Sequence, residues 1–388
     1  METLKLLLIT ATLYGLTACG GGGSDDPTIL EGYFKDTGAG GVEYQAGGIT
    51  SVTDEKGRFM YESGDSVTFS VGNVVLGTTK GKSVVTPVDF VNGGSSDSIR
   101  VQNIVRFLLM LDGDNIPDNG IAISPTLSSF AIDWDQVDFD TNDLDAELVT
   151  NIADANTADG RTHVLPNAAT AKSHLESTLL CTRSGAYRGT FNGDATGPFG
   201  FWINAQTGLL TGFAFSSEDL ELLTLSGTSS ISFDQNATFI SGDTNTGSTF
   251  NGAFSGPDGV TGIWSNVSFG TSGNFAGNRI GGDLTAVHRF TGTFTGDAFG
   301  LFSFDVDLAG NVTGFAHTVL ALADGTTNEL APLTGTLTGT SFTAIIADAG
   351  VVDATISGSL NTTTGTANGT WSDADGNSGS FVGSGCKL

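Results

Sequence analysis

Apolar and polar residues alternate along the second half of the chain with the two-residue period of a β-strand. In the stretch 290–297 (FTGTFTGD), the phenylalanines and glycines fall on one face, and the threonines and the aspartate fall on the other. Glycines between aromatic residues on one face favour a strongly curved antiparallel sheet, because the rings can lie over bare backbone. The pattern therefore predicts curved strands with one apolar side.

This pattern occurs twice. The stretch 187–194 (YRGTFNGD) nearly matches 290–297, and further matching pairs follow in the same order at slightly varying separations. They are 199–203 (FGFWI) with 302–306 (FSFDV), 211–214 with 313–316 (both TGFA), 262–265 (GIWS) with 369–372 (GTWS), and 272–275 (SGNF) with 378–381 (SGSF). We predict a duplicated β unit, with copies at 181–285 and 286–388 and about eight strands in each.

Each copy is most simply an antiparallel eight-stranded meander barrel or a barrel-like sandwich, because closure removes the exposed edges of a sheet. A transmembrane barrel has the same alternation with its apolar side outward. Many of the expected strands are too short for that role, and no girdle of aromatic residues is evident. A continuous β-solenoid would need more even spacing between turns.

Residues 28–180 have a mixed pattern that predicts a small α+β domain. Short alternating runs in 28–92 predict a β-sandwich, and the clearest hairpin spans 53–61 with Asp54 and Gly57 in its turn. Helical spacing in 93–180 predicts a helix capped by Asp97 and two more at 142–155 and 166–180. The whole chain is therefore expected to be mainly β.

The segment 53–59 (TDEKGRF) carries the motif Thr-Asp-x-x-Gly-x-Phe, which resembles that of the immunoglobulin-like sandwiches of the carboxypeptidase-regulatory type. The resemblance covers about sixty residues of the N-terminal part and concerns the fold. It implies a module that supports or presents a neighbouring domain and carries no catalytic residues.

The N-terminus has the features of an export signal. Lys5 and the apolar run 6–16 have about half the length of a membrane-spanning helix. The run ends in Leu16-Thr17-Ala18-Cys19, which resembles the lipobox of bacterial lipoproteins. The resemblance implies a signal peptide at 1–18, an acylated Cys19 and a flexible tether at 19–27. An ordinary signal peptide with a chance cysteine is the alternative.

In that family an aspartate after the cysteine retains the protein on the inner membrane, whereas here Gly20 follows it. The resemblance therefore implies anchoring to the outer membrane, facing either the periplasm or the cell surface. More than one acyl chain is needed for stable anchoring, and lipoproteins of this type carry them on the cysteine. The anchor would be the contact of this protein with the membrane.

The composition indicates a folded β protein and argues against nucleic-acid binding. Of the 388 residues, 39% are hydrophobic and 15% charged, which is enough apolar material for folded cores. The 56 glycines have no triplet period and favour a many-turned β protein over collagen. A net charge of −27 repels phosphate backbones, so no nucleic-acid partner is expected.

The chain has three cysteines, and acylation of Cys19 would leave Cys181 and Cys386 as a pair. They flank the duplicated β region, so a disulfide between them would join its two ends in an oxidising compartment. Two free thiols are the alternative.

An acidic loop at 112–120 (DGDNIPDNG) is the candidate cation site. Asp112, Asp114 and Asp118 supply hard oxygen ligands of the kind that calcium prefers. The spacing does not fit an EF-hand, and a solvated turn after a helix is the alternative. Calcium is the one candidate cofactor.

No nucleophile elbow, zinc-binding helix or paired Cys-x-x-Cys motif occurs, so the sequence predicts no enzyme. The C-terminal half resembles the β-barrels of surface lipoproteins such as the transferrin-binding type, which also follow a lipobox and a glycine-rich tether. The resemblance implies adhesion or the binding of a surface protein, glycan or small molecule.

Two alternatives stay open: an envelope scaffold or accessory subunit, and an exported hydrolase. The hydrolase would use an acidic site between domains, built from Asp112, Asp114, Asp118, Asp133, Asp135, Asp138 and Asp140.

Overall fold

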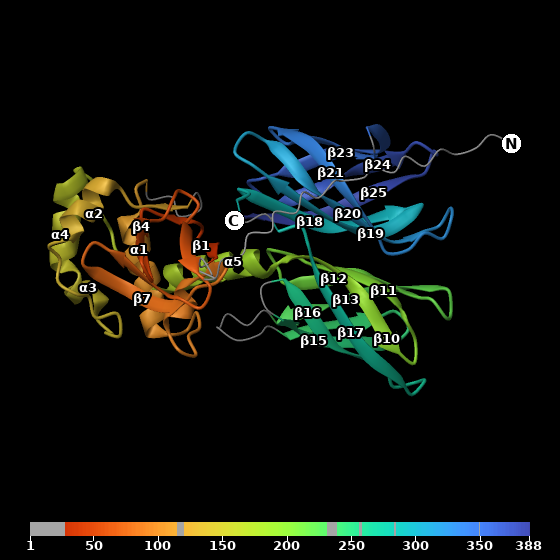
Figure 1. Ribbon diagram of the computed structural model, residues 1–388, viewed down its shortest axis with the longest axis horizontal. Coiled ribbons are helices and arrows are strands. Elements are labelled where there is room, and N and C mark those ends of the chain that lie inside the picture. Colours follow the sequence, from red (N-terminus) through yellow and green to blue (C-terminus); the bar gives the residue numbers. More distant parts are fainter. Residues whose placement is uncertain (1–27, 115–119, 231–238, 256–257, 283–284, 349) are drawn as a thin grey trace, which may run out of the picture.

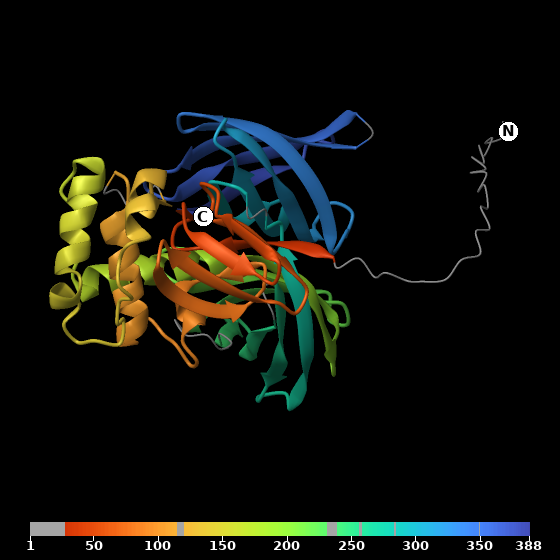
Figure 2. The ribbon, with the colours of Figure 1, turned by 60° about the vertical axis from the view of Figure 1, so that its left-hand side comes forward.

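The computed structural model describes residues 28–114, 120–230, 239–255, 258–282, 285–348 and 350–388. It consists of an N-terminal region of strands and helices and of two β-barrels that lie against each other (Figure 1). The helices α2 (Pro125–Ala131) and α4 (Val149–Asp159) lie on the outer side of the N-terminal region, away from both barrels (Figures 1 and 2). No helix among the described residues is long and apolar enough to cross a membrane.

The strands of the N-terminal region form two main sheets and one short parallel pair. The three-stranded sheet has the order β5-β1-β8, the four-stranded sheet has the order β4-β3-β6-β7, and β2 pairs with β9. Their bounds are β1 Ile29–Phe34, β2 Ala39–Gly40, β3 Glu43–Ala46, β4 Ile49–Val52, β5 Arg58–Glu62, β6 Ser66–Val71, β7 Val74–Lys80, β8 Val84–Val85 and β9 Ile121–Ala122.

The hairpin predicted at 53–61 is wrong as a pairing, although its turn is present. Asp54 accepts hydrogen bonds from the backbone N–H groups of Lys56 and Arg58, and Gly57 has φ of +80°. The strands on either side belong to different sheets, because β4 pairs with β3 while β5 pairs with β1. The sequence predicts the turn from its local residues, whereas the choice of strand partner depends on distant residues.

The helices pack on one continuous core with these sheets. The helix α1 (Ile99–Leu111) is almost wholly buried along its length and starts one residue later than predicted, with Ser98 rather than Asp97 at its N-cap. The remaining helical elements are the short 3₁₀ turn Pro87–Phe90, α3 Leu144–Glu147, the α2 and α4 helices given above, and α5 Ala168–Arg183. Phe107 contacts Trp134 and Phe139 edge to face, which anchors the loop between α2 and α3 to this core.

Two closed eight-stranded meander barrels follow α5, so the predicted fold class is confirmed. The first consists of β10 Gly185–Gly193, β11 Gly197–Ile203, β12 Leu209–Ser216, β13 Glu221–Ser230, β14 Phe239–Thr244, β15 Ser248–Ser255, β16 Gly259–Asn266 and β17 Thr271–Ile280. The second consists of β18 His288–Gly296, β19 Ala298–Val306, β20 Asn311–Ala321, β21 Glu329–Thr338, β22 Ser341–Asp348, β23 Val351–Asn361, β24 Thr366–Asp373 and β25 Ser378–Lys387. In each barrel the first strand pairs with the last.

The registers of the two barrels correspond residue by residue. Gly189 pairs with Phe199 in the first barrel, as Gly292 pairs with Phe302 in the second. Asp194 accepts a hydrogen bond from the N–H of Ser272 at 2.9 Å, and Asp297 accepts the same bond from Ser378 at 2.9 Å. The predicted repeat is therefore a repeat of structure, down to the turns.

Aromatic and aliphatic side chains fill the interiors of both barrels, as the alternating pattern predicts. Glycines on the same faces let strands approach these rings: a Cβ at Gly292 would lie 2.2 Å from the carbonyl oxygen of Val382 and 2.6 Å from the ring of Phe302. The curvature inferred from Gly-x-Phe segments thus has a steric cause.

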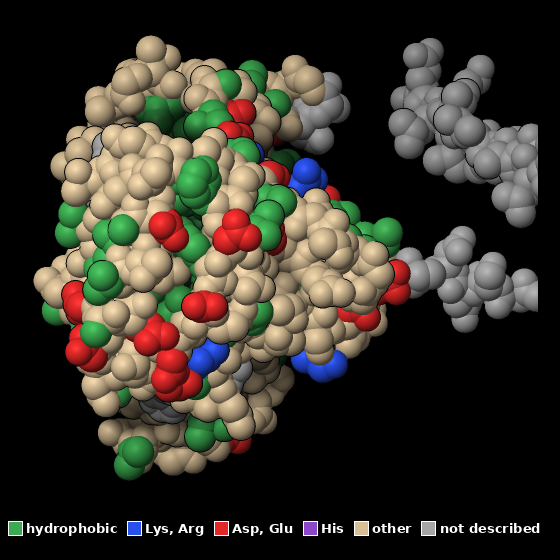
Figure 3. All heavy atoms as spheres, turned by 90° about the vertical axis from the view of Figure 1, so that its left-hand side faces the viewer, with side chains coloured by type: hydrophobic (Ala, Val, Ile, Leu, Met, Phe, Trp, Pro, Cys, Tyr) green, Lys and Arg blue, Asp and Glu red, His purple; other side chains and the backbone are tan. Residues whose placement is uncertain are grey.

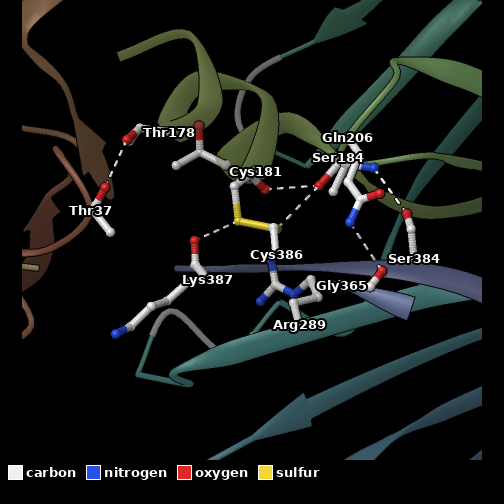
Figure 4. The surroundings of a disulfide bond; sticks show 12 residues. Thr37, Thr178, Cys181, Ser184, Gln206, Arg289, Gly365, Ser384, Cys386 and Lys387 are labelled. Carbon is white, nitrogen blue, oxygen red and sulfur yellow. Dashed lines mark hydrogen bonds between the residues drawn. A yellow bond between two sulfur atoms is a disulfide. The ribbon is translucent and has the colours of Figure 1, made fainter. Parts of the chain in front are cut away.

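Cys181 and Cys386 form a disulfide with an S–S distance of 2.10 Å (Figure 4). Cys181 lies near the end of α5, and Cys386 lies on the last strand of the second barrel. The bond joins the start of the β region to its end, so the second barrel is covalently held beside α5. Close to it, Gln206 of the first barrel donates to the carbonyl oxygens of Thr364 and Gly365 in the second.

Candidate ligand-binding cavity

The second barrel contains a cavity of about 840 Å³ that opens at one of its ends. Its residues come from the ends of the strands next to the β18–β19, β20–β21, β22–β23 and β24–β25 turns, and from deeper positions on the inner faces of these strands. Pockets that hold small molecules have volumes of roughly 300–1,000 Å³ and are mostly apolar. The cavity therefore has the size of a small-molecule site.

The wall of the cavity is aromatic and aliphatic. Phe302 and Phe304 stack with ring centroids 4.3 Å apart, and Phe381 meets Phe302 edge to face at 5.3 Å. The larger apolar lining residues are Phe294, Phe302, Phe304, Ile346, Ile356, Trp371 and Phe381. Below them Phe342 contacts Phe304 and closes the cavity toward the rest of the barrel core.

Two half-buried aromatic residues stand near the mouth. The rings of Phe294 and Trp371 meet at nearly a right angle with centroids 6.0 Å apart. The indole Nε1 of Trp371 donates to the carbonyl oxygen of Thr295 at 3.3 Å, which fixes the ring against β18. Both side chains line the cavity, so part of their ring surface faces its open space.

Carboxylates surround the mouth. The acidic lining residues are Asp297, Asp324, Glu329, Asp353, Asp373 and Asp375, whereas no Lys, Arg or His lines the cavity among the described residues. Hydrogen bonds from the backbone N–H and side chain of Thr326 hold the pKa of the Asp324 carboxyl below its ordinary value. A bound molecule would therefore contact an apolar wall inside the cavity and negative charge at its rim.

Side-chain size explains why this barrel has space. In register, Ile356 of the second barrel corresponds to Phe250 of the first, because each lies opposite a tryptophan of the next strand. Ala331 corresponds likewise to Leu223, each opposite an alanine. Phe250 contacts three other aromatic rings in the first barrel, and the smaller isoleucine and alanine of the second leave room at the same places.

The site residues expected from the sequence lie elsewhere. Asp112 is buried, and its Oδ1 accepts a hydrogen bond from the backbone N–H of Ala122 at 3.0 Å. Asp114 is described, whereas Asp118 and Cys19 lie outside the described residues. No group of three or more His, Cys, Asp or Glu residues in the described part of the chain is arranged to hold a metal ion.

The acidic segment after α2 is engaged locally. Asp140 forms an ion pair with Arg100 at 3.0 Å, and Asp138 accepts from the backbone N–H of Asp140. Asp133 and Asp135 are exposed to solvent. None of these four residues lines the cavity. Calcium binding by 112–120 stays a prediction.

The sequence pattern does not reveal the cavity, although several of the lining residues fall at repeat positions. Phe294, Trp371 and Phe381 belong to the matched segments of the two copies. The decisive positions, Ala331 and Ile356, lie in stretches where the copies do not visibly match. Their smaller size has meaning only once the register of both barrels is known.

Comparisons with known proteins give limited information. No family model and no curated protein matches the sequence. Among solved structures, a mutant of the vaccine antigen transferrin-binding protein B from Haemophilus parasuis is similar over 53% of this chain and 76% of that chain, with 10% sequence identity and a TM-score of 0.20.

Proposed function

We propose that this chain is a non-catalytic binding protein of the cell envelope, whose second barrel takes the apolar part of a small molecule into its cavity. The observation that carries the proposal is an aromatic wall that opens to solvent at the end of an otherwise filled barrel. Folded proteins rarely leave such a surface uncovered without a use for it.

The chemistry of the lining supports binding rather than catalysis. The described lining residues include no Cys, His or Lys that could act as nucleophile or base at neutral pH. The carboxylates stand at the rim, and three of them accept hydrogen bonds from turn N–H groups, namely Asp297, Asp324 and Asp373. These bonds hold the three carboxylates against the turns, which suits a fixed rim.

The lipobox supports the location in the envelope, and Cys19 is the residue that would carry the acyl chains. Acyl labelling that is absent in a Cys19→Ser variant tests this part. Adhesion or protein binding by the paired barrels stays a prediction from the sequence. The two interiors differ, however, which favours one small-molecule site over two equal ones.

The experiment that tests the proposal closes the cavity with the residues of the first barrel. Ile356→Phe combined with Ala331→Leu should fill the space that Phe250 and Leu223 fill in the first barrel. The neutral fluorophore N-phenyl-1-naphthylamine should bind the unchanged protein saturably, and the double variant should bind it at least about tenfold more weakly, a loss of roughly 1.4 kcal/mol.

Ile345→Phe is the matched control, since Ile345 lies on the outer face of β22 and is 38% exposed. It makes the same change of side chain outside the cavity and should leave the affinity unchanged. Equal binding of the probe by the double variant and the unchanged protein would overturn the proposal, as would the absence of saturable binding.

A further inference from the structure

Charge is distributed unevenly along the second barrel. We infer that the ligand is an organic cation, with an apolar body that occupies the cavity and an amine or quaternary ammonium group that stays at the mouth. This inference rests on the proposed function. The inference concerns the chemical class of the ligand and follows from charges, aromatic surface and wall polarity at the same opening.

Six of the nine acidic residues between 288 and 388 line the cavity, so the negative charge of this barrel is concentrated at the mouth. Acidic side chains outnumber basic ones on the N-terminal face as well (Figure 3), so an acidic surface alone would say little. In the second barrel, however, the residues from 288 to 388 include only two of Lys or Arg type, Arg289 and Lys387. Both lie at the end of the barrel opposite the mouth, where β18 begins and β25 ends.

The basic residues cannot offset the rim from that distance. Arg289 is 2% exposed, and its Nε donates to Asp305 at 2.8 Å, so its charge is already paired inside the protein. Strand β18 is nine residues long, and at about 3.3 Å per residue its two ends lie farther apart than one Debye length of about 8–10 Å. Within the second barrel, therefore, no basic residue offsets the negative charge at the mouth.

Three of the rim carboxylates have no hydrogen bond or ion pair from their side chains to the described part of the chain: Glu329, Asp353 and Asp375. They come from β21, β23 and the β24–β25 turn, and so they approach the opening from different sides. An ammonium group at the mouth would interact with several of them at once, whereas an anionic head group would be repelled by all.

Aromatic surface at the mouth favours the same class of ligand. Trp371 and Phe294 are half-buried there, and an ammonium group over the face of an indole ring is attracted by the negative face of the ring. The corresponding Trp264 of the first barrel is only 5% exposed. The second barrel thus combines an open indole face with free carboxylates.

The lining does not suit simpler cations. Below the rim, residues such as Phe302, Phe304 and Ile356 offer no oxygen ligands, and no group of three or more His, Cys, Asp or Glu residues in the described part of the chain is arranged to hold a metal ion. A polyamine would place charged nitrogens against these rings without partners, at considerable desolvation cost. One charged group on an apolar body fits both parts of the cavity.

The test compares three probes that share an octyl chain and differ in head group: octyltrimethylammonium, octyl glucoside and octyl sulfate. Each is titrated calorimetrically into the full chain below its micelle concentration. We expect the cation to bind at least about tenfold more tightly than the neutral probe, with octyl sulfate the weakest. The preference should shrink as salt is raised, because rim charges are exposed.

A triple variant, Glu329→Gln with Asp353→Asn and Asp375→Asn, should abolish the preference for the cation and leave the affinity for octyl glucoside unchanged. Its matched control makes the same change in net charge on the N-terminal region, with Glu55→Gln, Asp133→Asn and Asp135→Asn, three exposed residues that do not line the cavity. The control should keep the preference.

The outcomes separate the inference from the proposed function. If the three probes bind equally, or if the control loses the preference as fully as the rim variant, the inference of a cationic ligand is overturned and the apolar cavity still stands as a binding site. If none of the probes binds, the proposed function fails as well.

Discussion

The two barrels share strand order, register and most of their inner aromatic residues, yet Phe250 packs against three rings in the described part of the first barrel, whereas the second barrel holds a cavity. Phe191, Phe199 and Phe275 of the first barrel have counterparts at Phe294, Phe302 and Phe381 in the second. What differs is a small number of positions at one end. Both copies of a duplicated barrel can thus keep the residues that determine the fold, while one copy gains open space for a ligand.

At the corresponding end of the first barrel, the described residues include hydrogen-bonded polar side chains beside Phe250. Asn266 donates to the hydroxyl of Ser248 at 3.0 Å, and the hydroxyl of Thr244 accepts from the N–H of Ser248 at 2.8 Å. In the second barrel the residues in register with Ser248 and Asn266 are Ala354 and Asp373. Alanine cannot form such a bond, so the polar closure is absent from this pair.

The largest expected contrast between the barrels is the loss of unfolding free energy when Phe250 or its counterpart Ile356 is truncated. Phe250→Ala should reduce the free energy of unfolding by about 3–5 kcal/mol, because Phe250 packs against Phe191, Phe199 and Phe275. Ile356→Ala should cost about 2 kcal/mol, since one side of Ile356 already faces the cavity. Urea unfolding measures both values. Equal losses would mean that the second barrel is packed as tightly as the first.

The sequence predicts the features that the two barrels share but not the positions at which they differ. Alternation and the Gly-x-Phe segments define strands, curvature and closure locally, and both copies carry them. The cavity depends on pairs such as Phe250 and Ile356, which are compared correctly only after strand register is known. Strand partners are equally non-local: the turn around Asp54 was recognisable, but the sheets that its two strands join are decided by β1 and β3.

The disulfide illustrates the opposite case. Cys181 and Cys386 are 205 residues apart, but their position at the two ends of the repeat made their pairing predictable. Topology brings the ends of a closed pair of barrels together, so a long separation in sequence was no obstacle. The rim carboxylates could not be found this way, because acidic residues are frequent throughout the chain and only their position around an opening distinguishes them.

A second contrast concerns pH, at the contact between the barrels. His317 is fully buried and corresponds to Phe215 of the first barrel. Its Nε2 lies 3.1 Å from Oδ1 of Asn328, whereas its Nδ1 has no hydrogen-bond partner among the described residues. Burial lowers the pKa of His317 to about 4, with Arg188 adding to the shift and the Asn328 bond opposing it.

Because the folded-state pKa lies below the ordinary value of about 6.5, the unfolded chain binds the proton first as the pH falls. Stability contributed by neutral His317 is present at pH 7 and is lost between about pH 6.5 and 4. His317→Gln should therefore reduce the loss of unfolding free energy between pH 7 and pH 5 by about 1–2 kcal/mol. Urea unfolding at both pH values measures this, and an unchanged difference in the variant would contradict it.

The smallest expected contrast tests the polar closure of the first barrel. Asn266→Ala should lower the free energy of unfolding by about 1–2 kcal/mol, because the buried hydroxyl of Ser248 and the carbonyl of Thr246 lose their donor. Asp373→Asn is the control at the matching position. It should cost less, since its neighbour Ala354 offers no acceptor and the bonds from the 375 and 377 backbone can be kept, so that only the bond from the Asn377 side chain is lost.

Combining Asp373→Asn with Ala354→Ser transfers the polar pair into the second barrel. If side-chain hydrogen bonds close the end of a barrel, this variant should bind N-phenyl-1-naphthylamine severalfold more weakly than Asp373→Asn alone, with less effect than filling the cavity by Ile356→Phe and Ala331→Leu. Unchanged probe affinity would show that packing by Phe250 and Leu223, rather than the polar pair, is what separates the filled barrel from the open one.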